Sequence, residues 1–162
     1  ISAEEVDEVN ISSTKIRRTI EAGEMELARK YMGEPFELFG KIIDGQAIGR
    51  ELGYPTANID IESEIKLIPK FGVYAANVLL SNGQINEGMM NIGVRPSVGM
   101  EKNNICIEVH ILDFNENLYG EHITIQLLSR FRSEMKFDSL FELKEQLNID
   151  EKNIRNYFTD IR

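Results

Sequence analysis

The middle of the chain, between Phe36 and Ser129, limits the fold most, because short runs rich in Val, Ile, Phe and Tyr alternate there with clusters of Gly and Asn. Such runs predict strands, and such clusters predict turns. Asn82-Gly83 separates two of the runs and is typical of a hairpin. Strands joined by hairpins, without helices between them, favour a closed antiparallel barrel. The predicted strands are Phe36–Ile43, Val73–Leu80, Gln84–Asn91, Asn104–Leu112 and His122–Leu128.

Helical patterns flank this β region on both sides. Toward the N-terminus, a helical pattern between Ile11 and Met32 is interrupted by Gly23, which predicts two short helices. Toward the C-terminus, Ser139 begins a capping box, and Asp150 is positioned to cap a separate final helix. The apolar stripes of these helices indicate that they pack against the barrel.

The charge and composition of the 162 residues exclude several classes of partner. A formal net charge of −9 argues against nucleic acid and against an anionic membrane, since both require a basic face. A nucleotide remains compatible, because a few local donors are enough to hold its phosphates. The single cysteine, Cys106, excludes an internal disulfide and fits the reducing cytoplasm. The chain begins at Ile1 rather than Met, so we expect a fragment of a longer protein, with a monomer as its default state.

The stretch from Gly40 to Asn58 is the most informative part of the sequence, and we read it as a strand that opens into an extended loop. Its glycines allow the backbone to approach a ligand closely and to direct N–H groups at an anion. Arg50 adds planar donors that suit phosphate. The residue order of a Walker A loop is absent. Turn formation alone would also explain the glycines.

Thr56 and Asn58 follow this loop directly. In an extended segment, residues two apart face the same side, so the two side-chain oxygens are expected to point to one place. Hard oxygen donors without full charge suit a Mg²⁺ ion that keeps its other contacts to phosphate and water. The alternative is a polar turn in which Asn58 bonds to the backbone.

Glu108 lies in a strand pattern whose isoleucine and valine residues occupy the opposite face. His110 and Cys106 share the face of Glu108. A positioned carboxylate there would be able to take the proton of an attacking alcohol as a general base. The alternative is a carboxylate that is merely solvated.

Two further segments have the character of ligand loops, namely Gly72-Val73-Tyr74 and the stretch from Asn91 to Ser97 that contains Arg95. Binding groups collect on loops that a rigid scaffold positions. Arg132 is a further candidate for contact with a phosphate. Ordinary strand connections and a surface cation are the alternatives.

Taken together, the order and spacing of these motifs resemble riboflavin kinases. The resemblance runs from about Phe36 to Phe158 and is carried by Gly49–Asn58, Asn91–Pro96, Glu108–Phe114, Arg132 and Phe137–Leu140. It implies a mainly β fold, a six-stranded antiparallel Greek-key barrel with C-terminal helices and a short N-terminal helical appendage. It also implies ATP-dependent phosphorylation of the 5′-hydroxyl of riboflavin, which gives FMN and ADP.

The resemblance assigns roles to individual residues. Glu108 would be the base, Thr56 and Asn58 would hold Mg²⁺ or another divalent metal, and Arg132 would lie in a mobile loop that closes over the flavin. Phosphoryl transfer needs mainly alignment and charge neutralisation, so this small set is sufficient. The loop around the ATP phosphates would contain Gly40, Gly45, Gly49, Arg50 and Gly53. The other residues expected to bind ATP or flavin are Pro55, Gly72, Val73, Tyr74, Asn91 and Arg95.

The N-terminal segment from Ile11 to Arg17 resembles the end of the adenylyltransferase module in bacterial bifunctional riboflavin kinase/FAD synthetases, with Lys15 where arginine is usual. We therefore expect residues 1–34 to be the helical tail of that covalently linked module and residues 35–162 to be the kinase. The nucleotide-binding histidine motif of the module is absent, so this chain should not make FAD. Tyr54 also stands where phenylalanine is common.

Two other functions fit a barrel of this kind. One is a flavin or nucleotide carrier without catalytic activity, which would not need Thr56, Asn58 and Glu108 together. The other is an oligonucleotide-binding barrel, which the acidic charge disfavours.

Overall fold

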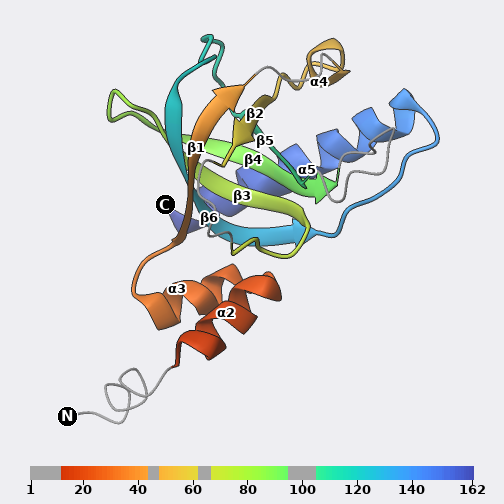
Figure 1. The fold of residues 1–162 in the computed structure, drawn as a ribbon. Helices are drawn as coiled ribbons and strands as arrows, with labels where there is room; N and C mark the ends of the chain where they lie inside the picture. The colour runs from red at the N-terminus through yellow and green to blue at the C-terminus, as the bar shows by residue number, and fades with distance from the viewer. Residues whose placement is uncertain (1–11, 44–47, 62–66, 95–104) are drawn as a thin grey trace, which may run out of the picture.

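A computed structural model describes residues 12–43, 48–61, 67–94 and 105–162, and it contains a closed β-barrel with helices around it (Figure 1). The helices are α2 (Ser13–Glu21), α3 (Met25–Met32), α4 (Ile48–Glu51) and α5 (Leu140–Ile161). The strands are β1 (Phe36–Ile43), β2 (Ala57–Asp60), β3 (Gly72–Leu79), β4 (Ile85–Val94), β5 (Ile105–Ile111) and β6 (His122–Arg132).

The barrel closes in the order β1-β2-β5-β4-β3-β6, and all of the pairs are antiparallel. Successive strands β3, β4 and β5 lie side by side, and β6 returns to pair with β3, which is the Greek-key arrangement. The predicted fold class is therefore confirmed. The sequence pattern missed β2 as a strand, because it is only four residues long and follows directly on the glycine-rich stretch.

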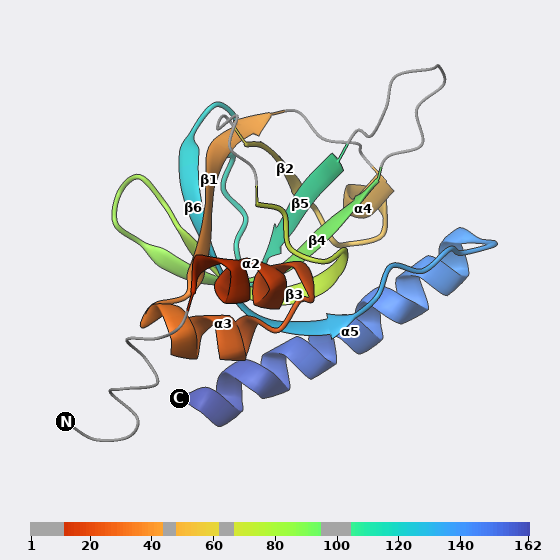
Figure 2. The ribbon, with the colours of Figure 1, turned by 60° about the horizontal axis from the view of Figure 1, so that its bottom comes forward.

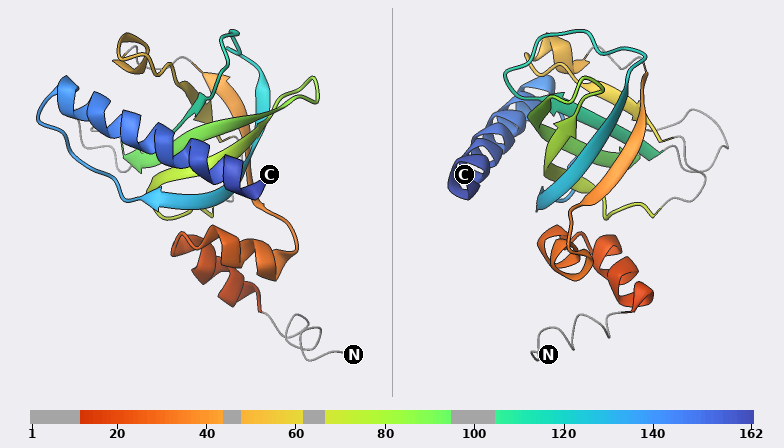
Figure 3. Two further views of the ribbon diagram at one scale, coloured as in Figure 1. Left: turned by 180° about the vertical axis from the view of Figure 1, so that it is seen from behind. Right: turned by 90° about the vertical axis from the view of Figure 1, so that its left-hand side faces the viewer.

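Alternation along the strands separates two apolar layers. Side chains such as Ile107 and Val109 of β5 point into the barrel and belong to its interior core, as the alternation predicts. On the outer face, Val73 of β3 and Met89 of β4 pack with Phe158 of α5. The helix α5 therefore crosses the outside of the barrel and covers one side of it (Figure 3).

The helices α2 and α3 lie against one end of the barrel (Figure 2). Ser12, one of two serines that the sequence offers as a cap together with Ser13, caps α2 by accepting a hydrogen bond from the backbone N–H of Lys15, at 3.2 Å. Ile20 and Met25 are buried in the same core cluster as the interior side chains of the strands. These helices therefore complete the core at that end of the barrel.

Replacing Ile20 with Val tests whether α2 and the barrel unfold together. Ile20 is 1% exposed, so the loss of one methylene group should cost about 1 kcal/mol of the free energy of unfolding. Denaturant unfolding, followed by a spectroscopic signal that comes from the barrel, measures the change in the free energy of unfolding. Ile149→Val is the matched control, because Ile149 is 52% exposed and should respond little. An unchanged barrel transition in Ile20→Val would show that α2 is an independent tail.

The predicted pair of C-terminal helices is corrected by the structure, because α5 runs without a break for 22 residues. Ser139 caps it, with its hydroxyl oxygen 3.1 Å from the backbone N of Glu142, as the capping box predicts. Asp150 lies inside the helix and caps nothing, since its carboxylate accepts hydrogen bonds from Arg132 and Gln146 instead. No glycine or proline occurs between the two ends of α5 to interrupt it.

Candidate active site

Five of the predicted site residues form one row across the barrel wall. Asn58 of β2 lies opposite Glu108 of β5, and Glu108 lies opposite Asn91 of β4. Asn91 in turn lies opposite Val73 of β3, which lies opposite Arg132 of β6. Residues directly opposite each other on neighbouring strands face the same side of a sheet. Because Val73 packs in the outer layer, the whole row faces outward, on the side that α5 covers.

A cleft of about 280 Å³, here called the outer cleft, lies between this row and α5. Its polar wall contains Glu108, Asn91 and Arg132, and its other walls are mainly apolar. The arrangement suits a ligand with a broad apolar body and a polar group that reaches Glu108. The residues that line it are Gly49, Tyr54, Thr56, Val73, Met89, Met90, Asn91, Glu108, His110, Arg132, Glu134, Met135, Phe137, Leu143, Leu147 and Asp150.

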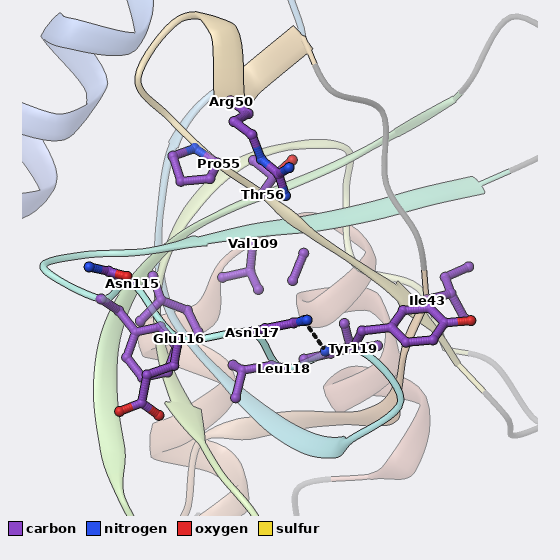
Figure 4. A pocket seen from close by; sticks show the side chains of 14 residues that line it. Ile43, Arg50, Pro55, Thr56, Val109, Asn115, Glu116, Asn117, Leu118 and Tyr119 are labelled. Atoms are coloured by element: carbon purple, nitrogen blue, oxygen red, sulfur yellow. Dashed lines mark hydrogen bonds between the residues drawn. The ribbon is translucent and has the colours of Figure 1, made fainter.

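A larger cleft of about 850 Å³, here called the barrel-end cleft, opens at the end of the barrel away from α2 and α3 (Figure 4). Arg50, Pro55 and Thr56 line one side of it, and the connection from Phe114 to Tyr119 lines another. The side chain of Asn117 accepts a hydrogen bond from the backbone N–H of Tyr119, at 3.0 Å, and this bond stabilises the turn in the connection. The sequence Asn115-Glu116-Asn117 predicts a turn there and gives no indication that the segment lines a ligand cleft.

Thr56 is the residue that the two clefts share, among those that the structure describes. The segment before it is not the extended loop that the sequence predicts. It forms the single turn of α4, followed by a return in which the N–H of Tyr54 donates to the Gly49 carbonyl at 2.7 Å. Gly53 has φ +84°, a conformation that glycine adopts without strain, and this closes the turn. The segment therefore places Gly49 in one cleft and Arg50 in the other.

Several other predicted ligand residues line neither cleft. Gly40 lies within β1 rather than in a phosphate loop, and a Cβ there would clash with the Asp60 carbonyl of β2. Tyr74 is fully buried in the barrel interior, where burial raises the pKa of its hydroxyl to about 12 and the hydroxyl donates to the Lys70 carbonyl. Gly53, Asn58 and Gly72 are absent from both linings, although Asn58 neighbours Glu108 in the row. Gly45 and Arg95 lie outside the described residues.

The resemblance places Arg132 in a loop, but in the structure it is the last residue of β6. Its Nη2 lies 2.7 Å from Oδ2 of Asp150, and its Nε lies 2.9 Å from Oδ1. Gln146 also donates to Asp150, at 2.9 Å. The ion pair joins the barrel to the middle of α5 and holds the guanidinium group at the wall of the outer cleft.

Tyr54 connects the turn before Thr56 to α5. Its hydroxyl oxygen lies 2.7 Å from Oε2 of Glu151 and 2.5 Å from Oδ1 of Asn148. Burial, together with the hydrogen bond to Glu151, raises the pKa of Tyr54 to about 12. Burial alone would raise the pKa of Glu151, but the hydrogen bonds from Tyr54 and Arg155 outweigh it and lower that pKa. Sequence reasoning missed this contact, and its one signal was a tyrosine where phenylalanine is common.

Replacing Tyr54 with Phe should remove about 1 kcal/mol of the free energy of unfolding, because a hydrogen bond to a carboxylate is lost. The raised pKa of Tyr54 makes its contribution complete below pH 10.0 and lost as the pH rises through about 12. The lowered pKa of Glu151 makes its contribution complete above pH 4.5 and lost as the pH falls through the lowered value. The difference between the two proteins in urea unfolding should therefore be largest between these limits. A difference that does not change with pH would contradict this account.

Thr56 and Asn58 offer a hydroxyl and an amide oxygen, the donor set that was expected for a divalent metal. Asn58 is buried, and Sγ of Cys106 lies 3.9 Å from its Oδ1, at the limit of a weak thiol hydrogen bond. Uncharged hard oxygens of this kind suit Mg²⁺ when phosphate supplies the remaining ligands. The chemistry of the two side chains therefore fits the metal that the motif implies.

Comparison with known proteins gives the family and its relatives. The family described as riboflavin kinase, or flavokinase, matches residues 32–158. The chain is 41% identical over 152 residues to a bifunctional riboflavin kinase/FMN adenylyltransferase of Buchnera aphidicola, covering 94% of this chain and 48% of the relative. It is 37% identical over 153 residues to the protein so described in Bacillus subtilis, with the same coverage. The chain thus spans about half the length of the curated relatives it matches.

Solved structures agree with the fold. A protein of Streptococcus pneumoniae, described as a macrolide-efflux protein, has a TM-score of 0.83 and 37% identity over 90% of this chain and 47% of its own. Riboflavin kinase from Trypanosoma brucei has a TM-score of 0.56 and 27% identity over 77% of this chain and 80% of its own. No helix in the described part of this chain has the length and apolar character needed to cross a membrane.

Proposed function

Because the chain belongs to the riboflavin kinase family, we propose that it transfers the terminal phosphoryl group of ATP to the 5′-hydroxyl of riboflavin, giving FMN and ADP. The observation that carries the proposal is the position of Thr56, which lines two clefts of different character. Phosphoryl transfer requires a donor and an acceptor that meet in line. Two clefts that meet at one hydroxyl-bearing residue provide such a meeting point.

We assign ATP to the barrel-end cleft. Its volume of about 850 Å³ is within the range of nucleotide-sized ligands. Arg50 supplies a planar cation for the phosphates, and it lies beside Thr56 in the close view of this cleft (Figure 4). The polar connection from Asn115 to Tyr119 supplies a wall at which a base with hydrogen-bonding edges can lie.

We assign riboflavin to the outer cleft. Met89 of the barrel, Phe137 of the β6–α5 connection and Leu143 of α5 give it the apolar surfaces that a flat tricyclic ring requires. The ribityl chain is polar, and Asn91 and Glu108 on the opposite wall offer it hydrogen-bonding partners. In this orientation the terminal hydroxyl of the chain reaches the row that contains Glu108.

Glu108 acts as the base in this proposal. Its carboxylate accepts the proton of the 5′-hydroxyl while the hydroxyl oxygen forms a bond to the terminal phosphorus of ATP. The bond from that phosphorus to the bridging oxygen breaks, and ADP leaves with the electron pair. A strand in the middle of a closed sheet fixes the backbone of Glu108, so that the carboxylate needs little reorganisation.

Thr56 and Asn58 would hold the magnesium ion, which when bound neutralises charge on the phosphates. Thr56 lies between the clefts, and Asn58 is the neighbour of Glu108 across β2 and β5. We further propose that the full-length protein carries an FMN adenylyltransferase module, of which residues 1–34 are the tail, as the twofold length of the relatives supports. The present chain would then make FMN and no FAD.

The test is to incubate the chain with riboflavin, ATP and magnesium and to separate the flavins by chromatography. We expect FMN, its loss when a chelator removes magnesium, and no FAD. If riboflavin binds but no FMN forms, the protein is a flavin carrier instead. If neither flavin binds, the assignment of the outer cleft is wrong.

A further inference from the structure

His110 is a buried side chain that takes no part in the proton transfer described above. It lies two residues after Glu108 on β5, so both side chains leave the strand on the outer face. Its Nδ1 lies 2.8 Å from the carbonyl oxygen of Pro55. A carbonyl only accepts hydrogen bonds, so Nδ1 must carry the proton. The bond therefore joins the strand of the proposed base to the residue before Thr56.

The bond acts where the regular pairing of the sheet has ended. The regular pairing of β2 with β5 begins with Ala57 opposite Val109, one residue after Thr56. Proline fixes its own φ but leaves ψ free to rotate. A hydrogen bond to the carbonyl of Pro55 restrains that remaining angle and so sets the plane of the peptide group that precedes Thr56.

Neighbouring groups keep the imidazole ring of His110 in place. The ring of Tyr54 meets it edge to face, with centroids 5.3 Å apart and an interplanar angle of 71°. The hydroxyl of Tyr54 is in turn held by Glu151 of α5. The imidazole is thus packed against a side chain that is itself fixed, and its Nδ1 has a defined direction.

We propose that His110 is a positioning residue, which fixes Thr56 relative to Glu108 through the hydrogen bond from Nδ1 to the Pro55 carbonyl. Its contribution is to alignment between the two clefts, and it exchanges no proton with the substrate. This inference rests on the proposed function, because misplacement of Thr56 is detected as a lower rate of phosphoryl transfer. It predicts that activity requires a donor at the position of Nδ1, whereas a role in packing alone does not depend on where the donor nitrogen lies.

Two substitutions separate positioning from packing. The amide nitrogen of asparagine occupies the position of Nδ1 in histidine, whereas the amide nitrogen of glutamine extends to the position of Nε2. His110→Asn therefore keeps the donor to Pro55 although it removes more of the ring, and His110→Gln moves the donor although it is closer to histidine in size. A packing role would favour glutamine, and a positioning role favours asparagine.

The kinetic measurement is kcat/KM for magnesium–ATP at saturating riboflavin, with the melting temperature of each variant recorded alongside. We expect His110→Gln to lose about tenfold and His110→Asn to stay within about threefold of the wild type, because small misplacements are costly in phosphoryl transfer. The inference is overturned if both variants match the wild type. It is equally overturned if glutamine is tolerated better than asparagine, or if both lose activity in proportion to a lowered melting temperature.

A second measurement does not depend on activity or on the folding of a variant at this position. The protein has two histidines, so ¹⁵N spectra of labelled histidine contain two imidazoles, and His122→Gln assigns them. At about pH 8.5, where an imidazole is ordinarily neutral, His110 should show the tautomer protonated at Nδ1. The tautomer protonated at Nε2 would refute the inference. Failure of the wild type to make FMN would refute only the proposed function and leave this result standing.

Discussion

Replacing Glu108 with Gln is expected to lower turnover by about 10²- to 10³-fold, because the amide cannot accept the proton of the ribityl hydroxyl. Glutamine has nearly the same shape, so the outer cleft should keep its form and its affinity for riboflavin. The expected result is thus a fall in kcat with little change in the dissociation constant for riboflavin. Single-turnover formation of FMN measures the chemical step, and quenching of flavin fluorescence measures binding.

Glu145→Gln is the matched control for this experiment. Glu145 is an exposed carboxylate on α5 that lines neither cleft, so its loss should leave turnover unchanged. Turnover of Glu108→Gln near the wild-type rate would show that another group, or water, accepts the proton. Loss of riboflavin binding in Glu108→Gln would instead show that the carboxylate binds the flavin in the ground state.

The fold was readable from the sequence wherever a local pattern decides the structure. The alternation along β5 placed Ile107 and Val109 in the interior, because a strand has a period of two and one face of it is buried. The capping residue Ser139 begins its helix as predicted, since a cap acts within a few residues of its own position. These features depend on residues that are close together in the chain, so the local sequence is enough to predict them.

The contacts that complete the candidate site were not readable in this way. Tyr54 and Glu151 are 97 residues apart in the chain, and nothing in either local pattern indicates that they meet. The position of Arg132 depends on how far β6 extends, and strand ends are set by partners rather than by composition. Asp150 reads locally as a cap, but the partly exposed guanidinium of Arg132 on the barrel gives it a different role.

Several of the residues expected to bind a ligand lie on strands, and two of them, Val73 and Asn91, stand at the ends of strands that the sequence predicts. Asn91, Val73 and Arg132 occupy β4, β3 and β6 at a single level of the barrel. Closed pairing on both sides restricts the motion of each strand, and groups on such elements are held more precisely than groups on loops. The proposed chemistry depends on alignment, so this placement favours it physically.

Replacing Asp150 with Ala should cause the largest loss of stability among the changes considered for this chain. The carboxylate is only 3% exposed, and it faces the guanidinium of Arg132, which is 17% exposed. Removing one partner of a buried ion pair leaves the other charge without compensation, which costs about 3–5 kcal/mol. The partial exposure of Arg132 allows water to reach it, so we expect a loss near the lower limit. Urea unfolding measures it, and Asp160→Ala, an exposed change on the same helix, is the control.

A double-mutant cycle identifies the cause of that loss. In Arg132→Met with Asp150→Ala, no uncompensated charge remains, so the double variant should be more stable than the sum of the two single losses predicts. Exact additivity would mean that the pair contributes nothing as a pair, and that Asp150 acts through Gln146 or through the helix alone. Arg132 and Asp150 both line the outer cleft, so Asp150→Ala should weaken riboflavin binding, whereas Asp160→Ala should not. Weakened binding together with a positive coupling energy would show that one ion pair both fastens α5 to the barrel and holds the cationic wall of the cleft.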